Sequence, residues 1–187
     1  EARFLDRVLT PLRAAHPDLK LTLEHVTTSE AVDWVRAHPG VGATITVQHL
    51  MANRNDMLAG GMRPHFYCLP ILKRGTHQTA LRQAATSGEA QFFLGTDSAP
   101  HPTHAKESAC CSAGCFTATH ALPLLAHVFE EEDALDRLEG FISLHEPAHY
   151  GLPVNDDTIT LSKGSHLDFP ARIEAYGQSV TLFDPGH

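Results

Sequence analysis

The sequence lacks several features that mark whole classes of protein. Its apolar runs fall short of the roughly 20 residues that a membrane-spanning helix needs, so we expect no membrane partner. Positive charge is scarce, because 14 lysines and arginines stand against 22 acidic residues, for a formal net charge of −8. That balance argues against a nucleic-acid partner, whose phosphates attract basic surfaces. With 13 glycines and 12 prolines in 187 residues, collagen-like and disordered classes are also excluded.

The chain also lacks an initiator methionine. It begins at Glu1, and residues 1–15 already place apolar side chains at helical spacing without a preceding cap. We therefore expect the sequence to be the later part of a longer protein. Its 187 residues, 42% of them hydrophobic, suffice for about one domain. No linker is visible, so 1–187 is expected to be a portion of a single domain.

Short apolar strands alternate with helices along the first half of the chain. Strands are expected at 20–26, 41–47 and 91–97. Between them we expect a helix that carries Val32, Trp34 and Val35 and stops near residues 38–40, and a second helix at 76–87. Strand, helix, strand, helix, strand is the order of a parallel α/β sheet.

Other local patterns are weaker. Thr27 and Glu30 have the spacing of a capping box for the first of these helices. Further helices are expected at 119–130 and 133–143, and a short strand at 158–161.

Two of the expected strands end in a side chain that can bind a metal. The first ends at His25 and the third at Asp97. The carboxyl ends of parallel strands open on one face of the sheet, where ligands bind, and imidazole and carboxylate both suit Zn²⁺. His25 can equally be a hydrogen-bonded structural residue, and Asp97 can cap the following turn. His101, in the loop after Asp97, can hold an anionic substrate, relay a proton or lie in solvent.

The four cysteines do not form a recognisable zinc motif. Cys110, Cys111 and Cys115 lack a C-x2-C pair, and Cys68 is remote in sequence. A structural zinc site here remains an alternative, and a disulfide requires an oxidising compartment. We expect reduced thiols packed in a loop.

Longer stretches resemble the later half of dihydroorotase, of the shorter bacterial type in the amidohydrolase superfamily. The resemblance covers nearly all of residues 1–160 and is weaker beyond them. It is carried by LEHVTTSEAVDWV, GATITVQHLMANRNDMLAGGMRPHFYCLPILKR, FFLGTDSAPHPTHAKESACCSAGCF, FEEEDALDRLEGFIS and YGLPVND. One departure is Cys110-Cys111-Ser112, where we expect the family to alternate Cys with Gly; it leaves Ala113 in register.

The resemblance implies an α/β fold, the later part of a (β/α)8 TIM barrel, with the three strands as its sixth to eighth. It implies two zinc ions at the barrel mouth. His25 and Asp97 match two of the family's metal ligands, whereas an H-x-H pair, a carboxylated bridging Lys and a further His are expected upstream of Glu1. Asp97 also matches the family's general base. His101, Leu69 and Ala113 match its substrate contacts, the last two through their backbones.

The function that the resemblance implies is the interconversion of N-carbamoyl-L-aspartate and L-dihydroorotate, a step of pyrimidine synthesis. The expected partners are this small-molecule substrate and a second copy in a homodimer, in the cytoplasm. Residues 1–187 alone are expected to be inactive. Two alternatives stay open: another dizinc cyclic amidohydrolase, such as one resembling hydantoinases, or a non-catalytic scaffold for a transcarbamoylase.

Overall fold

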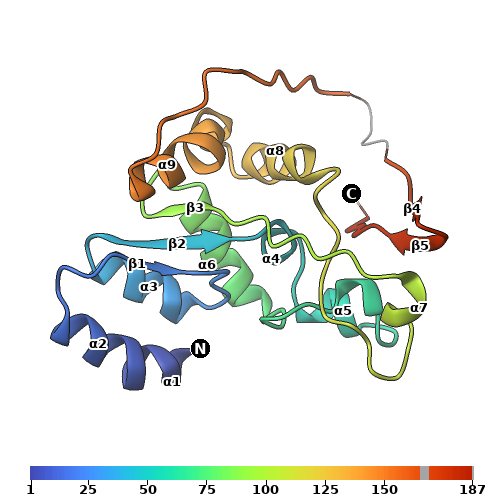
Figure 1. Ribbon diagram of the computed structural model, residues 1–187, viewed down its shortest axis with the longest axis horizontal. Helices are drawn as coiled ribbons and strands as arrows, with labels where there is room; N and C mark the ends of the chain where they lie inside the picture. Colours follow the sequence, from blue (N-terminus) through green and yellow to red (C-terminus); the bar gives the residue numbers. More distant parts are fainter. Residues whose placement is uncertain (165–168, 187) are drawn as a thin grey trace.

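A parallel sheet of three strands lies at the centre of the protein (Figure 1). The computed structural model describes residues 1–164 and 169–186. The strands are β1 (Leu21–Leu23), β2 (Val41–Ile45) and β3 (Phe92–Leu94), in the order β1-β2-β3. The middle strand, β2, is uncharged and buried along its whole length. The predicted alternation of strand and helix is confirmed, although each strand is shorter than expected.

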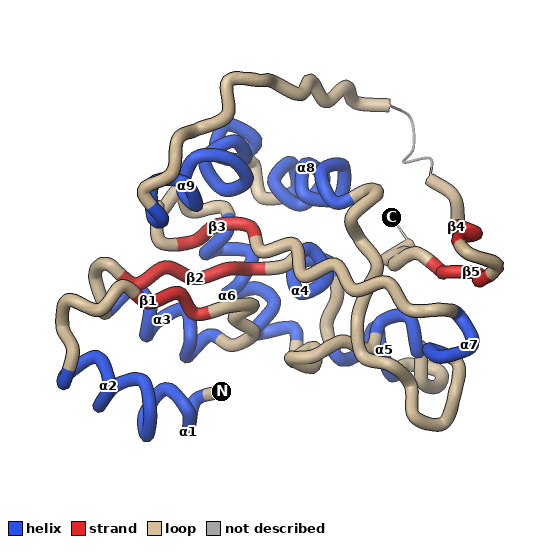
Figure 2. Tube along the Cα trace, viewed as in Figure 1, coloured by secondary structure: helices blue, strands red, loops and turns tan. Residues whose placement is uncertain are grey.

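Two helices cover one face of this sheet. The chain passes from β1 to β2 through α3 (Ser29–Ala37) and from β2 to β3 through α6 (Gly75–Ala85). Figure 2 shows both helices on the same side of the strands. Their buried positions are apolar and recur at helical spacing: Ala31, Val32, Val35, Leu81, Ala84 and Ala85. The N-terminal helical segment α1 (Ala2–Phe4), η1 (Leu5–Leu9) and α2 (Thr10–Ala15) runs unbroken and precedes β1.

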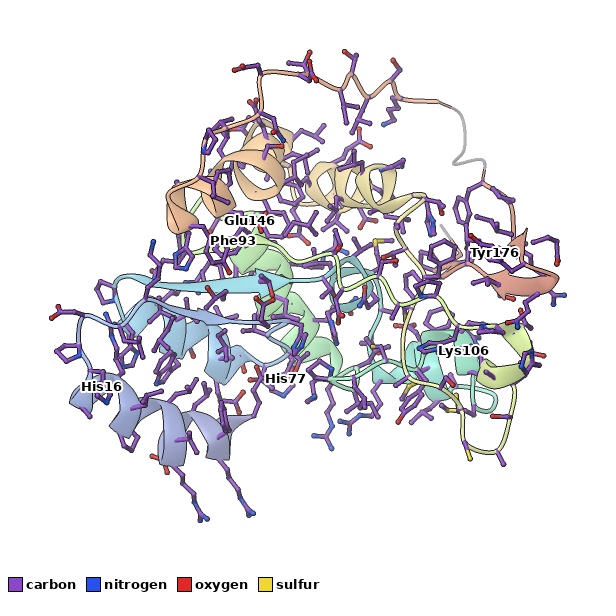
Figure 3. The ribbon with its side chains drawn as sticks, in the orientation of Figure 1. His16, His77, Phe93, Lys106, Glu146 and Tyr176 are labelled. Atoms are coloured by element: carbon purple, nitrogen blue, oxygen red, sulfur yellow. The ribbon has the colours of Figure 1, made fainter. Side chains whose placement is uncertain are left out.

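The opposite face of the sheet meets α9 (His145–Tyr150). The elements before it are α8 (Ala121–Glu131), η3 (Leu135–Arg137) and η4 (Gly140–Leu144). Of these, α8 lies beside α6, to which it is joined by the ion pair of Arg82 and Glu131. The ring of His149 on α9 lies 5.4 Å from that of Phe93 on β3. A Cβ on Gly42 would lie 2.8 Å from the His149 ring, so only glycine fits there. Figure 3 shows the labelled Phe93 in this layer, between the sheet and α9.

The connections at the carboxyl ends of the strands form the other end of the molecule. They contain α4 (Val47–Met51), α5 (Arg54–Leu58), η2 (Pro64–Phe66) and α7 (Thr103–Lys106). An antiparallel hairpin of β4 (Arg172–Ala175) and β5 (Gln178–Thr181) packs beside α7, where the Thr103 and Thr181 hydroxyls lie 2.9 Å apart. Figure 1 shows the chain arching from α9 toward this hairpin.

Two local predictions are wrong. The cap of α3 is Thr28, whose side chain accepts a hydrogen bond from the Ala31 N–H, rather than Thr27. The Thr27 hydroxyl instead bonds the carboxylate of Glu1, a partner that a local pattern cannot reveal. Residues 158–161 form no strand, because this exposed segment pairs with no other described segment. Among the described residues, no helix is long and apolar enough to cross a membrane.

Candidate functional site

The carboxyl ends of β1 and β3 meet on either side of Thr44, a residue of β2. The Thr44 hydroxyl accepts a hydrogen bond from the His25 N–H at 2.6 Å and donates one to the Glu24 carboxylate at 2.9 Å. On the other side, a Cβ on Gly95 would lie 2.5 Å from the Thr44 Cβ. Asp97 follows Gly95 by two residues, so the structure places His25 and Asp97 at one edge of the sheet.

The backbone leaves both strands in the same unusual conformation. His25 has φ of 40° and Asp97 has φ of 39°, in the left-handed region that few residues other than glycine adopt. Such strained residues cluster at sites where the surrounding structure fixes a side chain for a task. Cys111, Asp133 and Tyr176 also have positive φ, so the conformation is shared by both predicted ligands but is not confined to them.

The environments of the two side chains differ. The Nδ1 atom of His25 is buried and has no hydrogen-bond partner among residues 1–164 and 169–186. A buried ring nitrogen without a partner is costly, and a metal ion is one group that satisfies it. Asp97 is exposed on the open edge. No group of three or more His, Cys, Asp or Glu side chains in the described part of the chain is arranged to hold a metal.

The loop after β3 brings two other predicted residues together. The Nε2 of His101 lies 3.0 Å from the Ala113 carbonyl oxygen, so this nitrogen carries the proton that is donated. The Ala113 N–H has no partner within the described residues. Gly114 must be glycine, because its φ is +148° and a Cβ would lie 2.6 Å from the Ala99 Cβ.

Leu69, the third predicted substrate contact, lies in a neighbouring loop. Its side chain is 59% exposed, and its main chain makes no hydrogen bond to the described residues. Two residues earlier, the Tyr67 carbonyl accepts the Gly114 N–H at 2.9 Å. The loops that carry Leu69 and Ala113 are therefore held side by side, and each has a peptide N–H that no described residue accepts.

Lys106 lies beneath these two loops. It is only 3% exposed, and its Nζ donates to the carbonyls of Tyr67 (2.8 Å), Ser112 (2.8 Å) and Gly114 (2.6 Å). The sequence prediction did not single out Lys106 or Thr44. A lysine in a polar loop carries no local signal of burial, since burial depends on contacts with a distant segment.

The cysteines are free thiols in different surroundings. Cys68 and Cys115 are buried, whereas Cys110 is exposed. A hydrogen bond between the two buried thiols lowers the pKa of Cys68 and raises the pKa of Cys115. The expectation of packed, reduced thiols holds for this pair and not for Cys110.

Two hollows in the surface lie away from these residues. One lies at the opposite edge of the sheet, between the start of β2 and α9, and is lined by Gly40, Val41, Ala90, Gln91, His145, Ala148 and His149. The other is lined by Asn53, Arg54, Asn55, Leu58, Arg74 and Gly75. Neither is lined by a predicted site residue.

Comparison with known proteins finds similar sequences, although no family model matches the chain. The chain is 67% identical over 187 residues to a dihydroorotase of Ruegeria pomeroyi and 63% identical to one of Cereibacter sphaeroides. Each match covers 100% of this chain and 54% of the relative. The chain thus spans about half the length of these curated relatives.

Solved structures agree. A dihydroorotase of Campylobacter jejuni superimposes with a TM-score of 0.88 at 32% identity, over 98% of this chain and 53% of that one. A dihydroorotase of Saccharomyces cerevisiae in complex with 5-fluoroorotic acid superimposes with a TM-score of 0.81 at 29% identity, over 98% of this chain and 54% of that one. An L-hydantoinase of Arthrobacter aurescens superimposes with a TM-score of 0.69 at 19% identity, over 80% of this chain and 35% of that one. At this identity the likeness shows a shared fold alone.

Proposed function

We propose that this chain, which is homologous along its whole length to dihydroorotases, is the C-terminal half of a zinc-dependent cyclic amidohydrolase. The complete enzyme interconverts N-carbamoyl-L-aspartate and L-dihydroorotate in pyrimidine synthesis. The observation that carries the proposal is the meeting of the His25 and Asp97 strand ends at Thr44, within a chain 67% identical to a dihydroorotase.

The three parallel strands are proposed to be strands six to eight of a (β/α)8 barrel. Among the described residues, β1 and β3 each pair on one side only, with β2. An open strand edge exposes unpaired N–H and C=O groups, which a closed barrel removes. The part of the relatives that this chain does not match supplies the strands that pair with these two edges.

Two zinc ions are proposed from the resemblance, and the residues at the strand ends fit such ions. Imidazole and carboxylate are both zinc ligands, and the buried Nδ1 of His25 has no hydrogen-bond partner among the described residues. His25 and Asp97 would each hold zinc, and the remaining ligands, a carboxylated Lys included, would come from the unmatched half.

The residues of this chain then have distinct tasks. Zinc, when bound, makes water a nucleophile near neutral pH and polarises the amide carbonyl that is attacked. The His25 imidazole and one carboxylate oxygen of Asp97 would hold the metal. The other carboxylate oxygen of Asp97 would accept the proton of the attacking water and give it to the departing ring nitrogen. Because Asp97 is exposed at the open edge, this second oxygen is accessible to the substrate.

The two loops grip the substrate. The N–H of Ala113, which has no partner among the described residues, binds its carboxylate as a donor to an anion. His101 donates its Nε2–H to the Ala113 carbonyl, so its contact with the carboxylate would use Nδ1 of the doubly protonated ring. The main chain of Leu69, which bonds none of the described residues, offers one N–H and one C=O, which match the paired acceptor and donor of a ring amide. These contacts need no polar side chain, which explains why an exposed leucine and an alanine occupy the positions.

The test uses the complete protein. Zinc content is measured, and dihydroorotate breakdown is followed by its ultraviolet absorbance in the wild type, in Asp97→Ala and in Asp136→Ala. Asp136 is also exposed but lies in η3, away from the site. We expect two zinc ions and turnover in the wild type and Asp136→Ala, and loss of turnover in Asp97→Ala. A zinc-free, inert wild type supports the scaffold function instead, and hydrolysis of hydantoins alone supports another cyclic amidohydrolase.

The homodimer and the cytoplasmic location belong to the same proposal and come from the resemblance alone. Sedimentation of the complete enzyme tests the first, with a monomer as the contradicting result, and cell fractionation tests the second.

A further inference from the structure

A buried lysine lies beneath the proposed substrate-binding loops. Lys106 ends α7, and Figure 3 places it at the end of the molecule formed by α5 and α7. Among the described residues it forms no ion pair with a carboxylate. Burying a charged group without a countercharge is expensive unless its hydrogen bonds are satisfied. Its retention at 3% exposure therefore calls for a physical reason.

The hydrogen bonds of Lys106 are fully satisfied by main-chain carbonyls. An ammonium group has three N–H donors, and three carbonyls lie within 2.8 Å of Nζ. Burial lowers the pKa of Lys106, yet a neutral amine has only two N–H groups and could make only two of the three hydrogen bonds. The geometry thus matches the protonated side chain.

The positions of the three carbonyls are informative. Ser112 and Gly114 are the residues on either side of Ala113, and Tyr67 lies two residues before Leu69. The Lys106 ammonium group therefore links the loop of Leu69 to the loop of Ala113. It bonds carbonyls close to the two residues whose main chains are proposed to contact the substrate. His101 is included, because its ring bonds the Ala113 carbonyl at 3.0 Å.

We propose that Lys106 is a positioning residue, whose ammonium group fixes the spacing of Leu69, Ala113 and His101 at which these residues bind the substrate. This inference rests on the proposed function. It assigns Lys106 no contact with the substrate or the metal ions. Its removal therefore weakens binding of substrate and transition state alike, which raises KM and changes kcat little.

The first variant is Lys106→Met in the complete, zinc-loaded enzyme, which keeps an unbranched side chain and removes the charge and the donors. We expect KM for dihydroorotate to rise about tenfold or more, with kcat within about threefold and zinc content unchanged. Lys20→Met is the matched control, because the exposed Lys20 also donates to a carbonyl, that of His149, at the other edge of the sheet.

A second variant reaches the same loops without removing the lysine. In Gly114→Ala the new Cβ would lie 2.6 Å from the Ala99 Cβ and 3.1 Å from the His101 ring. We expect the same rise in KM. Gly75→Ala is its control, since a Cβ there meets nothing within 4 Å. If Lys106→Met fails to fold, Gly114→Ala decides the question.

A readout independent of activity completes the test. Hydrogen exchange of the amides in residues 98–118 is expected to quicken in Lys106→Met and to stay unchanged in both controls. Unchanged KM in the folded variants, or a fall of kcat and stability with KM unchanged, overturns the positioning role. An inert wild type overturns the proposed function, and the substrate-positioning role with it; the exchange rates then show only whether Lys106 holds the loops together.

Discussion

Gly95→Ala tests the packing that brings the two proposed ligands together. Gly95 continues β3, and its N–H donates to the Ile45 carbonyl at 3.2 Å. A Cβ at this position would lie 2.5 Å from the Thr44 Cβ, 2.8 Å from its hydroxyl and 3.1 Å from its methyl group. Thr44 is β-branched and 5% exposed, so its side chain has little room to rotate away.

The expected cost follows from this geometry. Forcing one extra methyl group into a packed site costs about 1–3 kcal/mol. At a urea m-value of about 2 kcal/mol/M, a loss of 2 kcal/mol lowers the unfolding midpoint by about 1 M. The strands must also separate, and a shift of about 1 Å at a catalytic group lowers the rate by about 10²-fold. Because His25 and Asp97 lie on either side of Thr44, both ligands move.

The assay is urea unfolding and dihydroorotate turnover of the complete enzyme, with Gly75→Ala as the control. Gly75 begins α6 and has open space around it, so the control is expected to keep both its midpoint and its rate. A Gly95→Ala enzyme with wild-type midpoint and wild-type turnover would refute the inferred contact between the ends of β2 and β3.

Three further predictions follow from other contacts. Arg82→Ala breaks two ion pairs of 2.7 Å, to Glu131 and Glu132, that join α6 to the C-terminal end of α8. We expect the free energy of urea unfolding to fall by about 1 kcal/mol at low salt and by less in about 0.5 M salt, and an equal loss under both conditions would contradict the prediction. Burial lowers the pKa of His120, so the folded state binds fewer protons than the unfolded state, and stability falls as pH drops from about 6.5 toward the folded pKa. In thermal unfolding at a series of pH values, His120→Gln should reduce this fall, and an unchanged slope would count against the prediction. Residues 1–187 alone should not turn over dihydroorotate, because the chain carries only two of the proposed ligands; measurable turnover by the purified chain would disprove this.

The sequence predicts the core of the fold because each of its elements has a local cause. The apolar runs around β1, β2 and β3 are long enough to mark strands, and the helices between them bury regular apolar stripes. The same runs locate His25 and Asp97 at strand ends. The structure adds their shared positive φ and the intervening Thr44, which follow from the pairing of strands and not from either strand alone.

The errors have equally physical causes. Residues 158–161 have β-forming side chains, but a strand needs a partner, and none of the described segments pairs with them. The sequence does not predict the hairpin of β4 and β5. Tyr176 and Gly177 between its strands both have positive φ, at 51° and 74°, as a tight hairpin turn requires, but a Tyr-Gly pair is a weaker sequence signal than Asn-Gly. The burial of Lys106 has no local sequence signal either, because it depends on contact with Tyr67, far away in the sequence.

Anomalous diffraction at the zinc edge, from crystals of the complete enzyme, tests most directly whether the ends of β1 and β3 share one metal centre. We expect two peaks about 3.5–4 Å apart, one about 2 Å from a ring nitrogen of His25 and the other about 2 Å from a carboxylate oxygen of Asp97. Zinc peaks that touch neither side chain, or that lie far apart with one on each, would contradict the account.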